Sequence, residues 1–454
     1  MIKERKAAYF TLGCKLNFSE TSTIGKILSE RGFRRIEAGE TPDICVVNTC
    51  SVTETADKKG RSLIRRISGR WPGATIVVTG CYAQLKPQEV AAIEGVDIVL
   101  GSNEKLRISS YLDDWERRHR AILEHTAARD ITTFMPSCER GDRTRYWLKV
   151  QDGCDYYCTY CTIPYARGKS RSGDIGSLVA QAREVARAGG KEIVLTGVNI
   201  GEFGRDTGES FFGLLKSLDA VEGIERFRIS SIEPNLITPE IIEWIARESR
   251  AFMPHFHIPL QSGSDAVLRL MNRRYDTSLF RSRIEFIKTL MPDAFIGVDV
   301  IAGARGETPE EWERSKEFIR SLDITRLHVF PYSERPGTAA LRLDAENVEP
   351  GERHRRVAEL QQISDAKMMD YMQSALGKRV EVLWEHVLHD TEKTPEPLMT
   401  GLTRTYLRVV APACEELLNT ITPARLLEIS PTRPETLVGV PAPLPPHHQT
   451  LPEK

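Results

Sequence analysis

The sequence lacks the features of a secreted or membrane-spanning protein. Its first residues, MIKERKAAYF, carry charges but no long apolar segment, so we expect no secretory signal. No run of about 18 apolar residues occurs, so no membrane span is predicted. Nine cysteines in 454 residues are too sparse for a disulfide scaffold. These absences favour a cytoplasmic protein whose clustered cysteines bind metal or carry out redox chemistry.

The chain also lacks a strong net charge and the common phosphate-binding motifs. Its 62 basic and 63 acidic side chains give a formal net charge of −1, so overall charge predicts no binding to nucleic acid. Neither a G-x-G-x-x-G fingerprint nor a P-loop follows a predicted strand. Basic segments nevertheless adjoin the cysteine motifs at 57–70, 139–145 and 166–172. Each alone is more typical of a solvated face, but their position favours a phosphate-binding role.

Hydrophobic patterning divides the chain into three units, predicted over 5–125, 140–372 and 374–438. The first alternates buried strands with helices, which indicates an open parallel α/β sheet. The second repeats that alternation six times, which predicts a partial (β/α)6 barrel with its active site at the carboxyl ends of the strands. The expected strands of these two units are 7–12, 44–49, 75–80, 96–101, 146–150, 192–197, 226–231, 255–260, 295–303 and 326–332.

The third unit has a different pattern. After a charged helix expected at about 350–374, short β-like segments occur at 378–385, 405–412 and 425–430. They predict a small C-terminal β-barrel. The Pro-rich end of the chain, PAPLPPHHQTLPEK, is predicted to be disordered.

The segment DGCDYYCTYC places Cys154, Cys158 and Cys161 at Cys-x3-Cys-x2-Cys spacing, with no fourth Cys or His nearby. Iron–sulfur clusters and structural zinc usually have four protein ligands. Structural zinc usually needs two Cys-x2-Cys pairs, and three polar-flanked cysteines are atypical of a core, although both remain alternatives. The spacing favours an iron–sulfur cluster with one iron open to a small molecule.

A second set of three cysteines is spread along the first unit. Cys14, Cys50 and Cys81 end the segments TLGC, VNTC and VTGC, each directly after a predicted strand. The carboxyl ends of parallel strands share one edge of a sheet, so these cysteines are expected to meet there. Ordinary core cysteines are the alternative, and Cys45, inside a strand segment, is predicted to be one.

These motifs give the chain a resemblance to a known family. A Cys-x3-Cys-x2-Cys loop at the head of a βα barrel resembles the radical S-adenosylmethionine superfamily, and the two cysteine sets together resemble its methylthiotransferases. The stretches that carry the resemblance are TLGCKLNFSE, VVNTCSVTETADKKGRSLIRR, TGCYAQ, LKVQDGCDYYCTYCTIPYARGKSRS, LTGVNIGEFG and HIPLQSGSDAVLRLMNRRY. Two departures are GARGET at 303–308, where the family usually has a GFPGET-like motif, and GLTRTYLRV at 401–409, which lacks the usual Asn before Tyr.

The motifs TLGCKLN, NTCSVTETADKK and LTGVNIG are most similar to those of the bacterial branch that acts on threonylcarbamoyladenosine in tRNA. The branch that acts on isopentenyladenosine usually has a YGCQMN-like first motif. The branch that methylthiolates a ribosomal-protein aspartate usually has an LGCxKN pattern. Those two substrates remain the alternatives within the family. A non-catalytic iron–sulfur protein that binds RNA is the alternative from another class.

The resemblance implies a transferase that adds a methylthio group to C2 of N6-threonylcarbamoyladenosine at position 37 of tRNA. It implies two 4Fe–4S clusters, one on each cysteine set, together with S-adenosylmethionine and a TRAM-like RNA-binding C-terminal barrel. The anticodon loop of tRNA, a reduced electron donor and a sulfur donor are the implied partners. An unactivated C–H bond at C2 needs the radical chemistry of a cofactor, because acid–base catalysis does not readily break it.

Further site residues are predicted from position. Tyr160 matches the aromatic residue that lies by the adenine in the superfamily. Strand ends of the barrel are expected to contact S-adenosylmethionine, with barrel packing as the alternative; these residues are Thr196, Gly197, Asn199, Ser231, Glu233, Gln261, Asp299 and Phe330. Basic residues beside the cysteine motifs are expected to contact tRNA phosphates; these are Arg61, Arg65, Arg167, Lys169 and Arg171.

Overall fold

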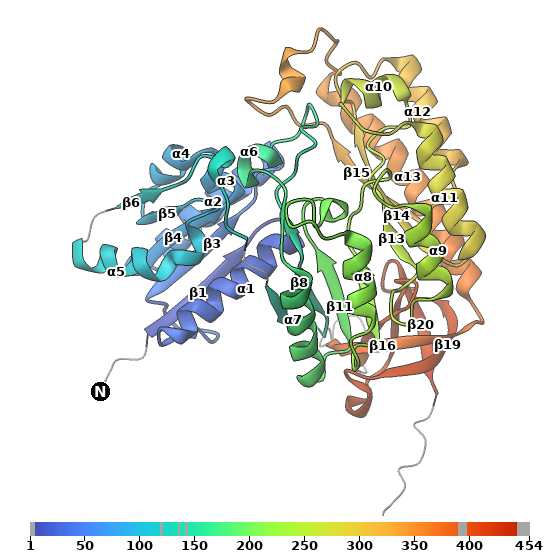
Figure 1. The fold of residues 1–454 in the computed structure, drawn as a ribbon, viewed down its shortest axis with the longest axis horizontal. Helices are drawn as coiled ribbons and strands as arrows, with labels where there is room; N and C mark the ends of the chain where they lie inside the picture. Colours follow the sequence, from blue (N-terminus) through green and yellow to red (C-terminus); the bar gives the residue numbers. More distant parts are fainter. Residues whose placement is uncertain (1–4, 119–120, 135–136, 141–143, 389–396, 443–454) are drawn as a thin grey trace, which may run out of the picture.

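The computed structural model describes residues 5–118, 121–134, 137–140, 144–388 and 397–442 (Figure 1). Part of the basic segment 139–145 and most of the Pro-rich end therefore lie outside the described residues. The chain forms an N-terminal parallel sheet, a central array of parallel strands with outer helices, and a closed C-terminal barrel. The predicted α/β fold class, including the small C-terminal barrel, is confirmed.

The N-terminal sheet has six parallel strands in the order β2-β1-β3-β4-β5-β6. They are β1 Arg5–Thr11, β2 Phe33–Arg35, β3 Ile44–Thr49, β4 Thr75–Gly80, β5 Ile98–Leu100 and β6 Ile122–Glu124. Every residue of the central strands β3 and β4 is buried, because helices cover both faces of the sheet. The four predicted strands are present, whereas the short edge strands β2 and β6 were not predicted.

Five helices belong to this sheet: α1 Lys15–Glu30, α2 Glu54–Arg70, α3 Cys81–Leu85, α4 Pro87–Ala91 and α5 Ile108–Arg118. The Thr53 hydroxyl caps α2 by accepting from the backbone N–H of Ala56. Helix α1 also packs against β7 and β8 of the central unit, so it is shared between the two sheets (Figure 1).

The central unit contains all six predicted parallel strands. They are β8 Tyr146–Lys149, β11 Glu192–Thr196, β12 Arg226–Ile229, β13 His255–His257, β14 Phe295–Ala302 and β15 Arg326–Pro331. The order is β8-β11-β12, then β13-β14-β15, joined by a parallel bridge between Ser231 and His257. The short strand β7 Cys138–Arg140 adds antiparallel to β8, and β9 Gln151–Asp152 pairs with β10 Arg171–Ser172. Within the described residues β15 pairs with β14 alone, so the array is a partial barrel.

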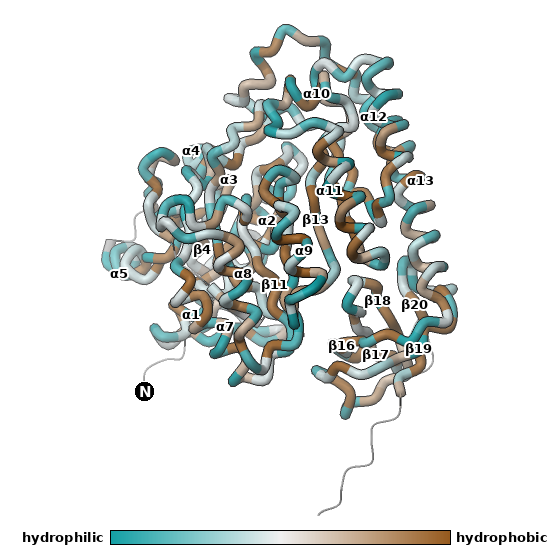
Figure 2. Tube along the Cα trace, turned by 45° about the vertical axis from the view of Figure 1, so that its right-hand side comes forward, coloured by the Kyte–Doolittle hydropathy of each residue, from teal (hydrophilic) through white to brown (hydrophobic). Residues whose placement is uncertain are grey.

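Helices cover the outside of this array, whose strand β11 runs as a hydrophobic segment in Figure 2. The helices of this unit are α6 Ile163–Arg167, which packs against α3, and α7 Ile175–Arg187, α8 Phe211–Asp219, α9 Pro239–Arg247, α10 Asp265–Leu270, α11 Thr277–Leu290, α12 Pro309–Ser321 and α13 Pro350–Ala375. Most begin at a side chain that accepts a backbone N–H, which explains why their starts follow short polar residues. The capping residues are Asp174, Ser210, Thr238, Ser264, Asp276 and Thr308.

The C-terminal barrel closes in the order β16-β17-β18-β20-β19. Its strands are β16 Arg379–Leu388, β17 Leu398–Thr403, β18 Arg408–Pro412, β19 Ile421–Ile429 and β20 Thr436–Pro441. The pattern predicted β16, β18 and β19 but not β17 or β20, because a glycine interrupts each of the latter. In β17 a Cβ at Gly401 would lie 2.5 Å from the Leu383 carbonyl oxygen, so close strand approach requires glycine there.

Buried arginines join this barrel to the central unit. The Arg226 guanidinium donates to the Leu402 carbonyl at 2.9 Å, and Arg228 donates to the Thr403 carbonyl at 2.8 Å. Arg145 pairs with Glu385 at 2.9 Å, with side chains only 5% and 1% exposed. Charges this deeply buried need their partners, so the barrel contributes to the stability of the central unit.

We therefore predict that Glu385→Ala lowers the free energy of unfolding by ~3–5 kcal/mol, because Arg145 is left as a buried charge without its carboxylate. Urea unfolding followed by tryptophan fluorescence would measure this, since Trp384 is buried beside Glu385. The control is Glu381→Ala on the same strand, whose side chain is 52% exposed. It should cost less than ~1 kcal/mol. Equal effects of the two changes would contradict the buried-pair interpretation.

Candidate active site

Cys14, Cys50 and Cys81 lie at one edge of the N-terminal sheet, directly beyond the carboxyl ends of β1, β3 and β4. Strand register produces this arrangement, because Thr11 pairs with Asn48 and Thr49 pairs with Gly80. The three thiols lie close enough for their charges to interact. The prediction that these strand ends bring the three cysteines together agrees with this geometry.

Glycine before two of these cysteines allows the close approach. Gly13 has φ +108°, and a Cβ there would lie 2.7 Å from the Cys50 Cβ. Gly80 has φ +96°, and a Cβ there would lie 2.3 Å from the Thr49 carbonyl oxygen. Any other residue would be strained and would push the cysteine loops apart. The Gly-Cys pairs in TLGC and VTGC are therefore structural requirements of the site.

Cys154, Cys158 and Cys161 lie in the loop between β9 and α6. Each sulfur accepts a hydrogen bond from a nitrogen, as thiolate ligands do. The donors are Asn199 Nδ2 to Cys154 at 3.9 Å, Arg273 Nη1 to Cys158 at 3.0 Å and the Ile163 backbone N–H to Cys161 at 3.4 Å. Burial raises the pKa of the Cys154 and Cys161 thiols to about 12, so a bound metal would have to displace their protons.

The spacing of the sulfurs in each cysteine set bears on which metal group they could hold. Among the described residues, no three His, Cys, Asp or Glu side chains converge closely enough to hold one metal ion. Each thiolate of a four-iron cluster binds a different iron, so a cluster accepts more widely spaced sulfurs than zinc does. All six cysteines are free thiols.

A buried network of charges lies beside the first cysteine set. Arg167 Nη1 donates to Glu20 Oε1 at 2.9 Å and to Asp152 Oδ1 at 3.1 Å, and Nη2 donates to Asn17 Oδ1 at 2.7 Å. Three further cations pair with the same two carboxylates; these are Lys105, Lys149 and Arg171. Four cations against two carboxylates leave an excess of two positive charges, which suits a neighbouring site of three thiolates.

The cations of this network act to lower the pKa of the neighbouring acidic groups, whereas burial acts to raise it. Burial raises the pKa of the Cys81 thiol to about 11 and raises that of Cys50, while the nearby Arg167 guanidinium lowers both. Burial alone would also raise the pKa of Glu20, but Arg167 and the two lysines hold it well below its usual range. The Glu20 carboxylate is therefore ionised at neutral pH.

The predicted tRNA contacts divide into buried and exposed residues. Arg167 is 2% exposed and Arg171 is 6% exposed, and both pair with Asp152. This contradicts the expectation that they bind phosphates, because neither guanidinium is open to solvent. Arg61 bonds Glu89 and the Tyr82 hydroxyl, whereas Arg65 and Lys169 are exposed.

A cavity of about 720 Å³ opens between the three units. Cys14 lines it, together with five of the predicted cofactor contacts, namely Thr196, Gly197, Ser231, Asp299 and Phe330. The C-terminal barrel contributes Leu402, Tyr406, Arg408 and Glu435 to the same wall. A volume of this size accommodates a cofactor with a substrate base.

The other four predicted contacts lie outside that wall. Asn199 lies beside Cys154, and its buried Oδ1 has no hydrogen-bond partner within the described residues. Glu233 forms an ion pair with Arg273, the residue that donates to Cys158. Tyr160 packs into a small hydrophobic cluster, and Gln261, which forms an isolated bridge with Val300 beyond β13, has φ +68°. Their roles remain predictions.

Sequence reasoning missed three histidines of the cavity wall. His257 Nε2 lies 2.7 Å from Asp299 Oδ1, and its ring centroid lies 5.1 Å from that of His328. His255 lies 4.3 Å from the Tyr406 ring. Burial lowers the pKa of His255 and His328, so both are neutral at neutral pH. The segment HFH in β13 is only a weak sequence indication of a site, because pairing between strands is what brings these rings together.

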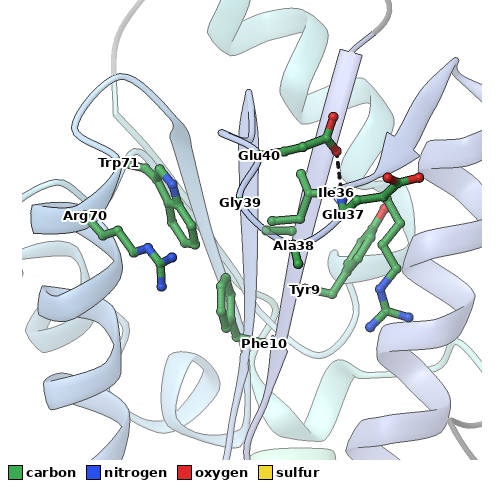
Figure 3. Close-up of a pocket in the computed structure, with 11 residues that line it drawn as sticks. Tyr9, Phe10, Ile36, Glu37, Ala38, Gly39, Glu40, Arg70 and Trp71 are labelled. Atoms are coloured by element: carbon green, nitrogen blue, oxygen red, sulfur yellow. Dashed lines mark hydrogen bonds between the residues drawn. The ribbon is translucent and has the colours of Figure 1, made fainter.

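A smaller hollow of about 300 Å³ lies elsewhere on the N-terminal unit (Figure 3). Phe10 and Trp71 lie on one side of it, with ring centroids 6.0 Å apart. Ile36 and the Glu37–Glu40 turn lie across from them, where the Glu37 N–H donates to the Glu40 carboxylate at 2.7 Å. Neither a cysteine nor any of the predicted site residues lines this hollow.

Family comparisons agree with this geometry. The model of the Radical SAM superfamily matches residues 148–319, and that of the uncharacterized protein family UPF0004 matches residues 6–101. The fold is also similar to that of the radical S-adenosylmethionine methyltransferase TsrM from Kitasatospora setae, with a TM-score of 0.54, 14% identity and coverage of 74% of this chain and 77% of that one. The partial barrel and its cysteine loop thus define a radical S-adenosylmethionine protein.

Proteins that are similar over most of this chain identify the family within this class. Threonylcarbamoyladenosine tRNA methylthiotransferase MtaB of Bacillus subtilis is 39% identical over 93% of each chain. The protein of that name from Aquifex aeolicus is 36% identical over 83% of this chain and 92% of its own. The tRNA-2-methylthio-N(6)-dimethylallyladenosine synthase of Desulfitobacterium hafniense is 30% identical over 92% and 94%. The chain belongs to the radical S-adenosylmethionine methylthiotransferase family, a family that implies an iron–sulfur cluster and S-adenosylmethionine.

The buried network predicts the behaviour of an Arg167→Met variant. Glu20 and Asp152 would lose a partner while remaining buried, so the free energy of unfolding should fall by ~3–5 kcal/mol. Since the folded pKa of Glu20 is depressed, its contribution is present above its unfolded pKa of about 4.3 and is lost as the pH falls. Urea unfolding of the variant should therefore depend less on pH between about 5 and 3 than that of the natural protein.

The matched control for this variant is Lys169→Met, because Lys169 is exposed and lies on the same loop. It should change stability by less than ~0.5 kcal/mol. If Arg167→Met were as stable as this control at neutral pH, the network would not hold the two units together.

Proposed function

We propose that this protein transfers a methylthio group to C2 of N6-threonylcarbamoyladenosine in the anticodon loop of tRNA. The observation that carries the proposal is that Cys14 of the first cysteine set lines the same cavity as Thr196 and Ser231, which lie at carboxyl ends of barrel strands. Support for the substrate comes from the relatives at 36–39% identity, which are named for threonylcarbamoyladenosine tRNA. The dimethylallyladenosine synthase at 30% identity supports the alternative less well.

We infer two 4Fe–4S clusters, one on each cysteine set. When bound, the clusters and S-adenosylmethionine supply the radical and the sulfur group that the reaction needs. The chain's own residues then have three tasks. Arg273 and Asn199 donate to the sulfurs of the second set, the buried cations would compensate the thiolates of the first, and the cavity wall would surround the reacting base.

We further propose how the chain holds its other partners. Thr196, Gly197, Ser231, Asp299 and Phe330 would contact S-adenosylmethionine from the cavity wall, and Asn199 and Glu233 from beside the second cysteine set. Arg65 and Lys169 are exposed and suit contacts to tRNA phosphates, which would fix the register of the RNA. The C-terminal barrel, assigned to 374–438, would add RNA contacts near the cavity.

The units over 5–125 and 140–372 are then the carriers of the first and second clusters. The proposal locates the enzyme with tRNA in the cytoplasm, supplied by a reduced electron donor and a sulfur donor. Within the described residues, no helix is both long and apolar enough to cross a lipid bilayer.

Iron content tests the two clusters. Anaerobically reconstituted protein should contain about eight irons per chain, and replacing Cys154, Cys158 and Cys161 together with Ala should leave about half. Replacing Cys14, Cys50 and Cys81 should also leave about half, but this variant should still form 5′-deoxyadenosine from S-adenosylmethionine. Cys45→Ala is the matched control, because Cys45 is a buried cysteine of β3 outside both sets. Full iron in either triple variant would sink the assignment.

Substrate identity is tested by offering the reconstituted enzyme three acceptors side by side: tRNA carrying threonylcarbamoyladenosine, tRNA carrying isopentenyladenosine, and ribosomal protein. Mass analysis of the digested products should find the methylthio group on the first acceptor alone. Preference for the isopentenyl tRNA would move the protein to the sister branch. If neither modified tRNA yields a methylthio product although tRNA binds tightly, a non-catalytic RNA-binding protein would be favoured.

A further inference from the structure

Lys15 stands at the meeting point of the first cysteine set and the cavity. It directly follows Cys14, begins α1, and lines the cavity wall with an exposed side chain. Among the described residues we find no ion pair for its ammonium group. A lysine that lines a cavity without a carboxylate partner is available to bind an anion.

The carboxylates of the cavity wall are already engaged. Asp299 bonds His257 at 2.7 Å, and Glu435 forms an ion pair with Arg326. Arg408, on the C-terminal barrel, is the other cation of the wall for which the described residues include no ion pair. Lys15 differs from Arg408 because it adjoins a cysteine of the proposed cluster, where the sulfur group would be delivered.

The charge of Lys15 acts on other groups of the cavity wall. Burial alone would raise the pKa of the Tyr406 phenol, yet the charges of Lys15 and Arg145 lower it to about 8. The same lysine contributes to the lowered pKa of His255 and of His328. An anion that enters this end of the cavity would therefore meet a favourable potential.

We propose that Lys15 binds the carboxylate of the threonyl group on the substrate base and thereby selects a charged modification over an uncharged one. This inference rests on the proposed function. C2 of the adenine must face the sulfur delivered beside Cys14, and on the ring N1 alone separates C2 from the carbon that carries N6. The N6 substituent is therefore brought to the vicinity of the residue that follows Cys14.

Lysine suits this role because its ammonium is a compact charge on a flexible stem, so it follows a carboxylate through small changes of orientation. An isopentenyl group offers no charge to Lys15 and would leave the ammonium unpaired. The YGCQMN-like motif of the isopentenyl branch has Gln after the cysteine, which makes Lys15→Gln the natural test substitution.

The experiment measures kcat/KM for two tRNA substrates that differ at one group. One carries threonylcarbamoyladenosine, and the other carries the same base with its carboxylate capped as the methyl amide. The natural protein should prefer the free carboxylate by roughly 10- to 100-fold, the factor expected from one charge-assisted hydrogen bond. In Lys15→Gln the preference should fall to near one, and Lys15→Arg should restore part of it.

Matched variants test whether Lys15 acts on the substrate itself. Lys26→Gln makes the same change at an exposed position of α1 and should keep the full preference. Iron content of every variant is measured alongside, and a loss of iron in Lys15→Gln would mean that Lys15 acts through the cluster, which overturns the inference. The inference would also be overturned if kcat/KM of Lys15→Gln fell equally on both substrates, or if only its KM for S-adenosylmethionine rose. Loss of the preference in Arg408→Gln in place of Lys15→Gln would overturn it as well. If the natural protein modified neither tRNA, the proposed function itself would fail.

Discussion

The arrangement of the whole molecule depends on the buried ion pairs around Arg167. Glu20 comes from α1 of the N-terminal unit, Asp152 immediately precedes the second cysteine loop, and Arg167 follows it and bonds both. Buried charges are tolerated only with good geometry and complete pairing. A displacement of one unit relative to the other would separate these charged partners without exposing them to water. The network therefore fixes one orientation of the two cysteine sets, whatever the apolar contacts alone would allow.

A second buried pair restrains the same interface at another point. Arg335, beyond β15, donates to Asp57 and to the Ser51 hydroxyl at 2.8 Å each. Ser51 directly follows Cys50, so the loop of the first cysteine set is held by a residue of the barrel. Two anchors resist rotation as well as translation. The common cavity is thus a consequence of polar contacts, which explains why it stays open between units that bury their apolar surface in separate cores.

Local sequence patterns predicted most strands and helices and the positions of the cysteines at strand ends. Buried parallel strands and capped helices have clear periodicity, and cysteines at strand ends follow from sheet geometry. Arg167 was misjudged because its basic surroundings indicate charge but not burial, and its carboxylate partners are distant in sequence. The cavity histidines were missed for a similar reason, since the contact of His257 with Asp299 depends on neighbouring strands. Strands β17 and β20 escaped prediction because barrel closure, and not propensity, makes them strands.

The division of the cavity wall among three units separates chemistry from selectivity. The barrel strands supply Thr196 and Ser231, which suit a cofactor common to the whole superfamily, and their positions are fixed by the parallel sheet. The side that we propose for the substrate is lined by Lys15 of the N-terminal unit and Tyr406 of the C-terminal barrel, neither of which belongs to that sheet. Residues there can change charge without disturbing strand pairing. A family that keeps one reaction while changing its acceptor is therefore expected to vary at this side of the cavity, where under our proposal a single cation would distinguish a charged base from an apolar one.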